Sequence, residues 1–166
     1  RQGPRVAPIR PDTGTQDIRR PLWGDVTVSY LFHPALIPHL PGPILRALHR
    51  DVCGLRGRRW GTPTPAAPYL RYSSWQQLLG YHAQILQEFK VRGYRFQAAW
   101  TSPHYRGRKV PPWAQDDFTP SLLVAPFDAH TPEYYTRSRE RAVKRLQRGN
   151  WLPEDTLRLY ASPRCI

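Results

Sequence analysis

The chain has 166 residues, a formal net charge of +13 and 40% hydrophobic residues. A chain of this length and composition buries enough apolar surface to fold as one domain, so it needs neither a metal nor a disulfide framework. Its longest apolar runs are far too short to cross a membrane, and its two cysteines, Cys53 and Cys165, lack metal-site spacing. The basic excess predicts a polyanion as partner, and no cofactor or metal is expected.

Residues 1–25 are predicted to form an extended arm rich in Arg and Pro, because prolines recur too often for a helix. An ordered arm of this composition is most simply held by a partner surface, so we expect neighbouring proteins to contact it. The chain opens on Arg1 and contains no Met, which is typical of a mature chain after transit-peptide removal and equally of a trimmed chain. The first alternative predicts the mitochondrial matrix; otherwise an intracellular location with reduced thiols is expected.

From residue 26 onward the pattern becomes that of a folded domain, which we place at residues 26–166. An apolar segment leads into a short helix predicted at Pro34–His39. A longer helix is predicted from about residue 43 to residue 53. Its apolar residues recur on one helical face, at Ile44, Leu45, Leu48 and Val52.

The clearest helix is predicted to begin at Ser74, where Gln77 completes a capping box, and to end at Gly93. Its buried stripe is predicted to contain Trp75, Leu78, Leu79, His82, Ile85, Leu86 and Phe89. His82 is therefore expected to be a core histidine and not a catalyst. Residues 94–120 are predicted to be irregular and crowded with aromatic side chains.

Residues 121–127 are expected to form a buried turn or short strand. The last helix is predicted from Thr131, with Pro132 in its first turn, to about Gln147, with Arg and Lys around most of its surface. The predicted fold class is therefore all-α: a compact single domain of about three main helices with long aromatic and Pro-rich loops, an extended N-terminal arm and a basic C-terminal helix.

Most of the positive charge lies in the centre of the chain, where residues 30–115 contain twelve basic and two acidic residues. Arg outnumbers Lys 22 to 3, a bias to which a GC-rich genome also contributes. A guanidinium group binds phosphate through two parallel hydrogen bonds, so we predict nucleic acid as the partner, with acidic lipid or an acidic protein as alternatives. The predicted contacts are Arg46, Arg50, Arg56, Arg58, Arg59, Arg106, Arg108, Lys109, Arg141, Lys144, Arg145 and Arg148.

Two glycine-containing loops, 56–59 and 106–109, are the strongest candidates, because glycine lets the backbone approach a phosphate closely. Plain solvated loops are the alternative. Trp60, Trp100 and Trp113 are predicted to be core residues, with base stacking as the alternative. His33 and His49 either face phosphate or are structural.

A series of motifs follows in a fixed order along the chain. They are LFHPALIPHLP at 31–41, HRD at 49–51, LRG at 55–57, WG at 60–61, YH at 81–82, RGY at 92–94, YRG at 105–107 and PW at 112–113. This ordered set resembles the pyrimidine-dimer DNA glycosylase family, in its small bacterial branch, over roughly residues 30–113. The resemblance implies a helical fold that grips and bends damaged DNA.

The resemblance also implies a mechanism, in which an N-terminal α-amine attacks the sugar C1′ to form an imine and a helix-borne carboxylate moves protons. Asp51 matches the carboxylate, Arg50 a neighbouring phosphate-gripping residue and Tyr30 the amine position. The sequence departs from the family here. Tyr30 follows Ser29, so its nitrogen is an amide that cannot form an imine, and the aspartate is one methylene shorter than the family's usual glutamate.

These departures favour a non-catalytic nucleic-acid-binding structural protein derived from the glycosylase fold, such as an rRNA-binding component of a mitochondrial ribosome. The alternative is an active pyrimidine-dimer DNA glycosylase/AP lyase in base-excision repair, with Asp51 catalytic. A scaffold that binds no nucleic acid is the third interpretation. Arg50 and Asp51 are equally well explained as a surface ion pair.

Overall fold

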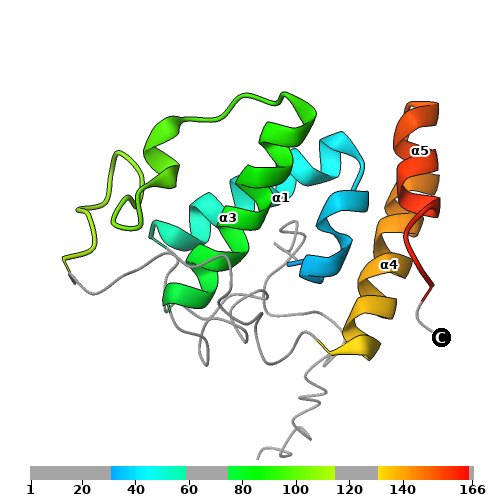
Figure 1. Ribbon diagram of the computed structural model, residues 1–166, viewed down its shortest axis with the longest axis horizontal. Helices are drawn as coiled ribbons and strands as arrows, with labels where there is room; N and C mark the ends of the chain where they lie inside the picture. The colour runs from blue at the N-terminus through cyan, green and yellow to red at the C-terminus, as the bar shows by residue number, and fades with distance from the viewer. Residues whose placement is uncertain (1–30, 59–74, 115–130, 165–166) are drawn as a thin grey trace, which may run out of the picture.

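The computed structural model describes residues 31–58, 75–114 and 131–164, which form an all-helical assembly (Figure 1). The helices are η1 (Pro34–His39), α1 (Gly42–Arg56), α3 (Trp75–Arg92), η2 (Ala98–Thr101), α4 (Pro132–Gln147) and α5 (Pro153–Tyr160). The all-α prediction is confirmed, and these described ranges contain no strand. None of the helices found there is long and apolar enough to cross a membrane.

Several predictions from sequence lie outside the described residues. They concern the arm at 1–25, Tyr30, Arg59, Trp60, the cap at Ser74, the segment 121–127 and Cys165.

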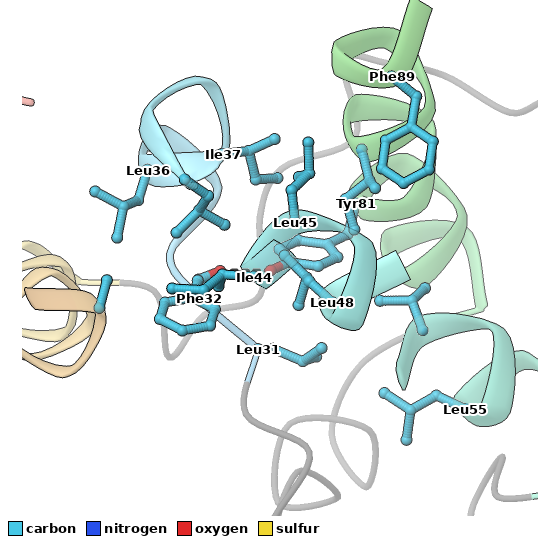
Figure 2. Close-up of a cluster of buried hydrophobic side chains, with 14 of the residues drawn as sticks. Leu31, Phe32, Leu36, Ile37, Ile44, Leu45, Leu48, Leu55, Tyr81 and Phe89 are labelled. Carbon is cyan, nitrogen blue, oxygen red and sulfur yellow. Dashed lines mark hydrogen bonds between the residues drawn. The ribbon is translucent and has the colours of Figure 1, made fainter. Parts of the chain in front are cut away.

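Helices α1 and α3 pack together around the main core. The predicted apolar faces of both helices are buried, which confirms the periodicity argument. Figure 2 shows Leu31 and Phe32 beside side chains of α1, with the Tyr81 hydroxyl of α3 reaching back to them. That hydroxyl donates a hydrogen bond to the Phe32 carbonyl at 2.6 Å, so the segment before η1 is fixed at the centre of the core.

Helix η1 is a 3₁₀ helix with proline at its start and again inside it, at Pro38. The His33 ring caps it, since Nδ1 accepts a hydrogen bond from the Ala35 N–H at 3.1 Å. The ring also packs edge-on against Tyr135 of α4, with centroids 5.3 Å apart. His33 therefore has a structural position, one of the two alternatives that its sequence context left open.

Helix α4 closes the core from the C-terminal side. It begins as predicted, with the Thr131 hydroxyl accepting from the Tyr134 N–H at 3.3 Å. The Tyr134 hydroxyl donates to the Leu31 carbonyl at 2.6 Å, and Ser138 Oγ accepts from the His33 N–H at 3.1 Å. Helix α4 thus packs directly against residues 31–33 at the start of the described chain. The C-terminal helices lie outside the stretch that resembles the glycosylase family.

Helix α5 was not predicted, and it supplies the cap that α1 lacks. The N-cap residue of α1 is Pro41, which has no side-chain hydrogen bond to offer. Asp155 Oδ1 instead accepts from the Gly42 N–H at 2.9 Å, across 113 positions of sequence. A Cβ at Gly42 would lie 2.6 Å from the Tyr94 hydroxyl, so a larger residue there would require the Tyr94 side chain to shift.

Helix α3 ends at Gly93, as predicted, in the left-handed region with φ of 71°. Directly before Gly93, Arg92 pairs with Glu88, one turn earlier, at 2.7 Å and donates to the Leu40 carbonyl at 2.6 Å. These contacts join the end of α3 to the end of η1 and set the position of Tyr94.

Replacing Asp155 with alanine removes the acceptor for the Gly42 N–H, and we expect a loss of about 1–2 kcal/mol in the free energy of unfolding. Urea denaturation of the purified chain measures it. Glu154→Ala is the matched control, because Glu154 carries the same charge in the same turn but is exposed. Equal losses in the two variants would show that the helix dipole, and not the cap, carries the effect.

Candidate nucleic-acid interface

Arg56 lies in the core, at the C-terminal end of α1. Its side chain is 1% exposed, and all four terminal N–H bonds have acceptors. These acceptors are the carbonyls of Trp100 (2.8 Å), Ser102 (2.6 Å) and Tyr105 (2.8 Å) and His82 Nδ1 (3.0 Å). Burial lowers the pKa of Arg56 to about 10, which leaves it cationic at neutral pH. The prediction that Arg56 contacts phosphate is therefore wrong for this conformation: its guanidinium organises a loop.

Arg106 joins the two Arg-Gly motifs that the sequence placed 50 positions apart. Its Nε donates to the Arg56 carbonyl at 2.9 Å and its Nη2 to the Gly57 carbonyl at 2.8 Å. These are carbonyls at the end of α1 that no helical N–H satisfies. The guanidinium also lies 5.3 Å from the Trp113 ring centroid. Arg106 is half-buried, so it acts first as a clamp between the loops.

A glycine at position 57 favours the clamp. A Cβ there would lie 3.1 Å from the Arg106 carbonyl, so a side chain would force the two backbones apart by a few tenths of an ångström. Gly107, with φ of 99°, turns the second loop. We call residues 56–58 and 105–109 together the joined Arg-Gly loops.

The joined loops expose three cations, on Arg58, Arg108 and Lys109. No acidic residue occurs anywhere from 93 to 114, so nothing in that segment neutralises them. Two further predicted cations, Arg46 and Arg50, are exposed on α1, and the Arg46 guanidinium stacks 4.2 Å from the centroid of the Tyr94 ring.

The predicted cations of α4 form a separate group. Arg141, Lys144, Arg145 and Arg148 are all exposed, opposite a buried face that includes Ser138, Ala142 and Leu146. In Figure 1, α4 lies at one end of the molecule and the 95–114 segment at the other. The cations that were predicted as one set of nucleic-acid contacts therefore lie on two separate surfaces.

The aromatic residues near the joined loops are mostly structural. Trp113 stacks on Trp75 with centroids 5.2 Å apart and packs against the core. Trp100 is half-buried and lines a cavity of about 200 Å³ between α3 and the 100–103 segment, together with Arg56 and Lys90. The Arg56 Nε is buried with no hydrogen-bond partner among the described residues.

A cluster that the sequence did not predict joins α1 to α3. His82 is fully buried, as expected of a core histidine, and its Nε2 lies 2.9 Å from His49 Nδ1. Because Arg56 donates to His82 Nδ1, the proton of His82 is on Nε2 and is donated to His49 Nδ1. The proton of His49 is then on its own Nε2, which lies 3.6 Å from Cys53 Sγ. One guanidinium thus fixes both tautomers.

Both imidazoles in this cluster are neutral. Burial, together with the charges of Arg50 and Arg56, lowers the pKa of His49 to about 4. Burial, Arg56 and His49 hold the pKa of His82 well below its usual value. Burial raises the pKa of the Cys53 thiol to about 12, so the sulfur is protonated in this arrangement.

The fold and these loops define a small helical protein with a cationic face. Its residues 28–102 match the family model of pyrimidine dimer DNA glycosylase, so this part of the chain is a pyrimidine dimer glycosylase-like domain. The match includes Tyr30, Arg50 and Asp51 together with helices α1 and α3, and it confirms the resemblance inferred from the ordered motifs. No curated protein and no solved structure matches the chain.

The histidine cluster predicts a loss of stability in mild acid. The unfolded chain titrates His49 near 6.5 and the folded chain near 4, so the unfolded state binds the extra proton between these values. The free energy of unfolding should therefore fall as pH drops from about 6.5 to 4, by about 1–2 kcal/mol after discounting for the partly exposed ring. Urea denaturation across this range measures the slope.

His49→Gln retains an acceptor for His82 Nε2–H and should reduce that pH dependence, while the part due to His82 remains. His39→Gln, on η1, is the control and should keep the wild-type slope. An unchanged slope in His49→Gln would assign the acid sensitivity to other groups.

Proposed function

We propose that this protein binds nucleic acid through its phosphate backbone and does not catalyse imine chemistry. The observation that carries the proposal is the clamp between the joined Arg-Gly loops, which presents Arg58, Arg108 and Lys109 together on a backbone held by Arg56 and Arg106. A rigid backbone reduces the conformational entropy lost when these cations meet phosphates.

Backbone contacts of this kind release counterions and carry little sequence information. Arg46 and Arg50 extend the cationic surface along α1. The similarity to DNA glycosylases supports DNA as a ligand, whereas phosphates alone do not distinguish DNA from RNA.

The covalent structure around position 30 supports a non-catalytic role. The peptide bond to Ser29 leaves an amide nitrogen at Tyr30, and an amide lone pair is delocalised into its carbonyl and does not attack a sugar. None of the three lysines lies on α1 with Asp51: Lys90 is on α3, Lys109 in the second Arg-Gly loop and Lys144 on α4.

We propose further that the protein serves as a structural component of a ribonucleoprotein particle, with rRNA as its ligand and a mitochondrial ribosome as the leading example. The net charge of +13, the Arg- and Pro-rich sequence before residue 26 and the exposed basic surface of α4 support this role, because each adds polyanion or partner contacts beyond the glycosylase-like core.

The second candidate is an active DNA glycosylase/AP lyase. The observation in its favour is that the family match spans both the amine position, Tyr30, and the carboxylate position, Asp51. In that case Asp51, which is half-buried on α1, is the proton-transfer group.

Removing the three loop cations tests the interface. The triple variant Arg58→Gln, Arg108→Gln, Lys109→Gln should bind up to about 100-fold more weakly, and the slope of log K against log salt should become shallower by about 2–3. Fluorescence anisotropy with a structured RNA hairpin and a duplex DNA of equal charge measures both quantities.

The matched control removes three exposed cations elsewhere, in Lys90→Gln, Arg95→Gln, Arg164→Gln. It changes net charge by the same amount and should alter binding only slightly. Equal losses in both triple variants would mean that overall charge, and not the joined loops, determines binding.

Borohydride trapping on abasic duplex DNA separates the two candidates. We expect the full chain to give no covalent adduct above the level of its Asp51→Asn variant, because no imine forms at position 30. A lyase with a free amine nucleophile serves as the positive control. An adduct that forms with the full chain and is lost in Asp51→Asn would establish the enzyme instead.

A further inference from the structure

The cluster of His49, Cys53 and His82 has the composition of a metal site. His49 and Cys53 lie four residues apart on α1, so their side chains share one face, and His82 comes from α3. One donor atom from each residue lies within 4.8 Å of the other two. The separations are 2.9 Å from His49 Nδ1 to His82 Nε2, 3.8 Å from Cys53 Sγ to His49 Nδ1 and 3.9 Å from Cys53 Sγ to His82 Nε2.

We propose that these three side chains bind a divalent transition-metal ion, with Zn²⁺ as the reference ion. Zinc binds imidazole nitrogen at about 2.0–2.1 Å and thiolate sulfur at about 2.3 Å, so ligands at tetrahedral angles lie about 3.3–3.6 Å apart. The observed separations of 2.9, 3.8 and 3.9 Å bracket that range. An ion therefore fits after side-chain shifts of a few tenths of an ångström.

The donor set selects the class of ion. A thiolate with two imidazoles favours zinc, cobalt or copper over magnesium and calcium, which prefer oxygen ligands. Three protein ligands leave one position of a tetrahedron open. His49 and Cys53 are only partly buried, so this fourth position is reached from solvent.

Arg56 determines the proton balance of binding. Its N–H occupies His82 Nδ1, and its other terminal N–H bonds are held by three carbonyls, so it stays a donor to that nitrogen. The ion therefore displaces the proton on His82 Nε2, and His82 binds as an imidazolate between the ion and the guanidinium. The Cys53 thiol loses its proton as well. Two protons leave for each ion bound, and the thiolate and imidazolate together balance its charge.

This balance makes the affinity steeply dependent on pH. The His82 and Cys53 protons must both leave before the ion binds, so each increase in pH favours the metal-bound form. The affinity should therefore rise with pH by up to about 100-fold per pH unit near neutrality.

Calorimetric titration of the metal-free full chain with Zn²⁺ tests the site. We expect one ion per chain with a Kd of about 1 µM or tighter, and release of two protons, obtained by repeating the titration in buffers of different ionisation enthalpy. A 100-fold excess over Kd should raise the Tm by about 5–10 °C. Co²⁺ should give a sulfur-to-cobalt charge-transfer band.

Variants at the outer ligands identify the atoms. Cys53→Ser should abolish the charge-transfer band, and His49→Gln should weaken binding at least about 10-fold. Cys165→Ser and His39→Gln are the controls and should bind as wild type does. The proposal is overturned by binding that survives Cys53→Ser, by a Kd weaker than about 10 µM or by ions that bind in no fixed ratio. Nucleic-acid affinity is measured with and without Zn²⁺, so that failure of the metal site and failure of nucleic-acid binding are observed separately.

Discussion

The guanidinium of Arg56 is the contact on which the cationic face depends. A buried cation is costly unless its donors have partners, and the four terminal N–H bonds of Arg56 find theirs in the carbonyls of Trp100, Ser102 and Tyr105 and in His82, while its Nε has none among the described residues. Those carbonyls belong to the 100–105 segment, whose own backbone hydrogen bonds are short 3₁₀ and turn bonds, so a single side chain joins this segment to the end of α1. Arg106 binds the carbonyls at the same end of α1. Together the two arginines fix the loops that present the exposed cations.

The same guanidinium also orders the polar cluster between α1 and α3. Because it donates to His82, it leaves one proton arrangement for both imidazoles and directs their chain of hydrogen bonds toward Cys53. The described arginines thus have different environments: Arg56 organises the core, Arg106 clamps two loops, Arg92 and Arg139 hold side-chain and backbone partners, and others are exposed on the surface. Composition alone describes all 22 in the same way, although only the exposed ones are available to a polyanion.

Periodicity was enough to predict α1 and α3, which each bury a stripe at helical spacing, and the boundary residues Thr131 and Pro132 were enough to predict where α4 begins. Helix α5 was missed because it has only eight residues and one buried side chain, Leu159. Arg56 was misplaced because its partners are backbone carbonyls more than 40 positions away, which no residue type marks. The histidine cluster was missed for a related reason: its three side chains come together only once two helices have packed.

Because Asp155 accepts the hydrogen bond from the Gly42 N–H, α1 obtains this cap only after residue 155 has been synthesised. Helix α1 leaves the ribosome long before position 155 is translated, and until then its first turn must find water or another acceptor. The glycosylase-like part of the molecule is therefore completed by a helix that is made after all of its own helices. A chain that stops short of α5 would retain the apolar contacts of α1 with α3 and yet begin α1 with an unsatisfied donor.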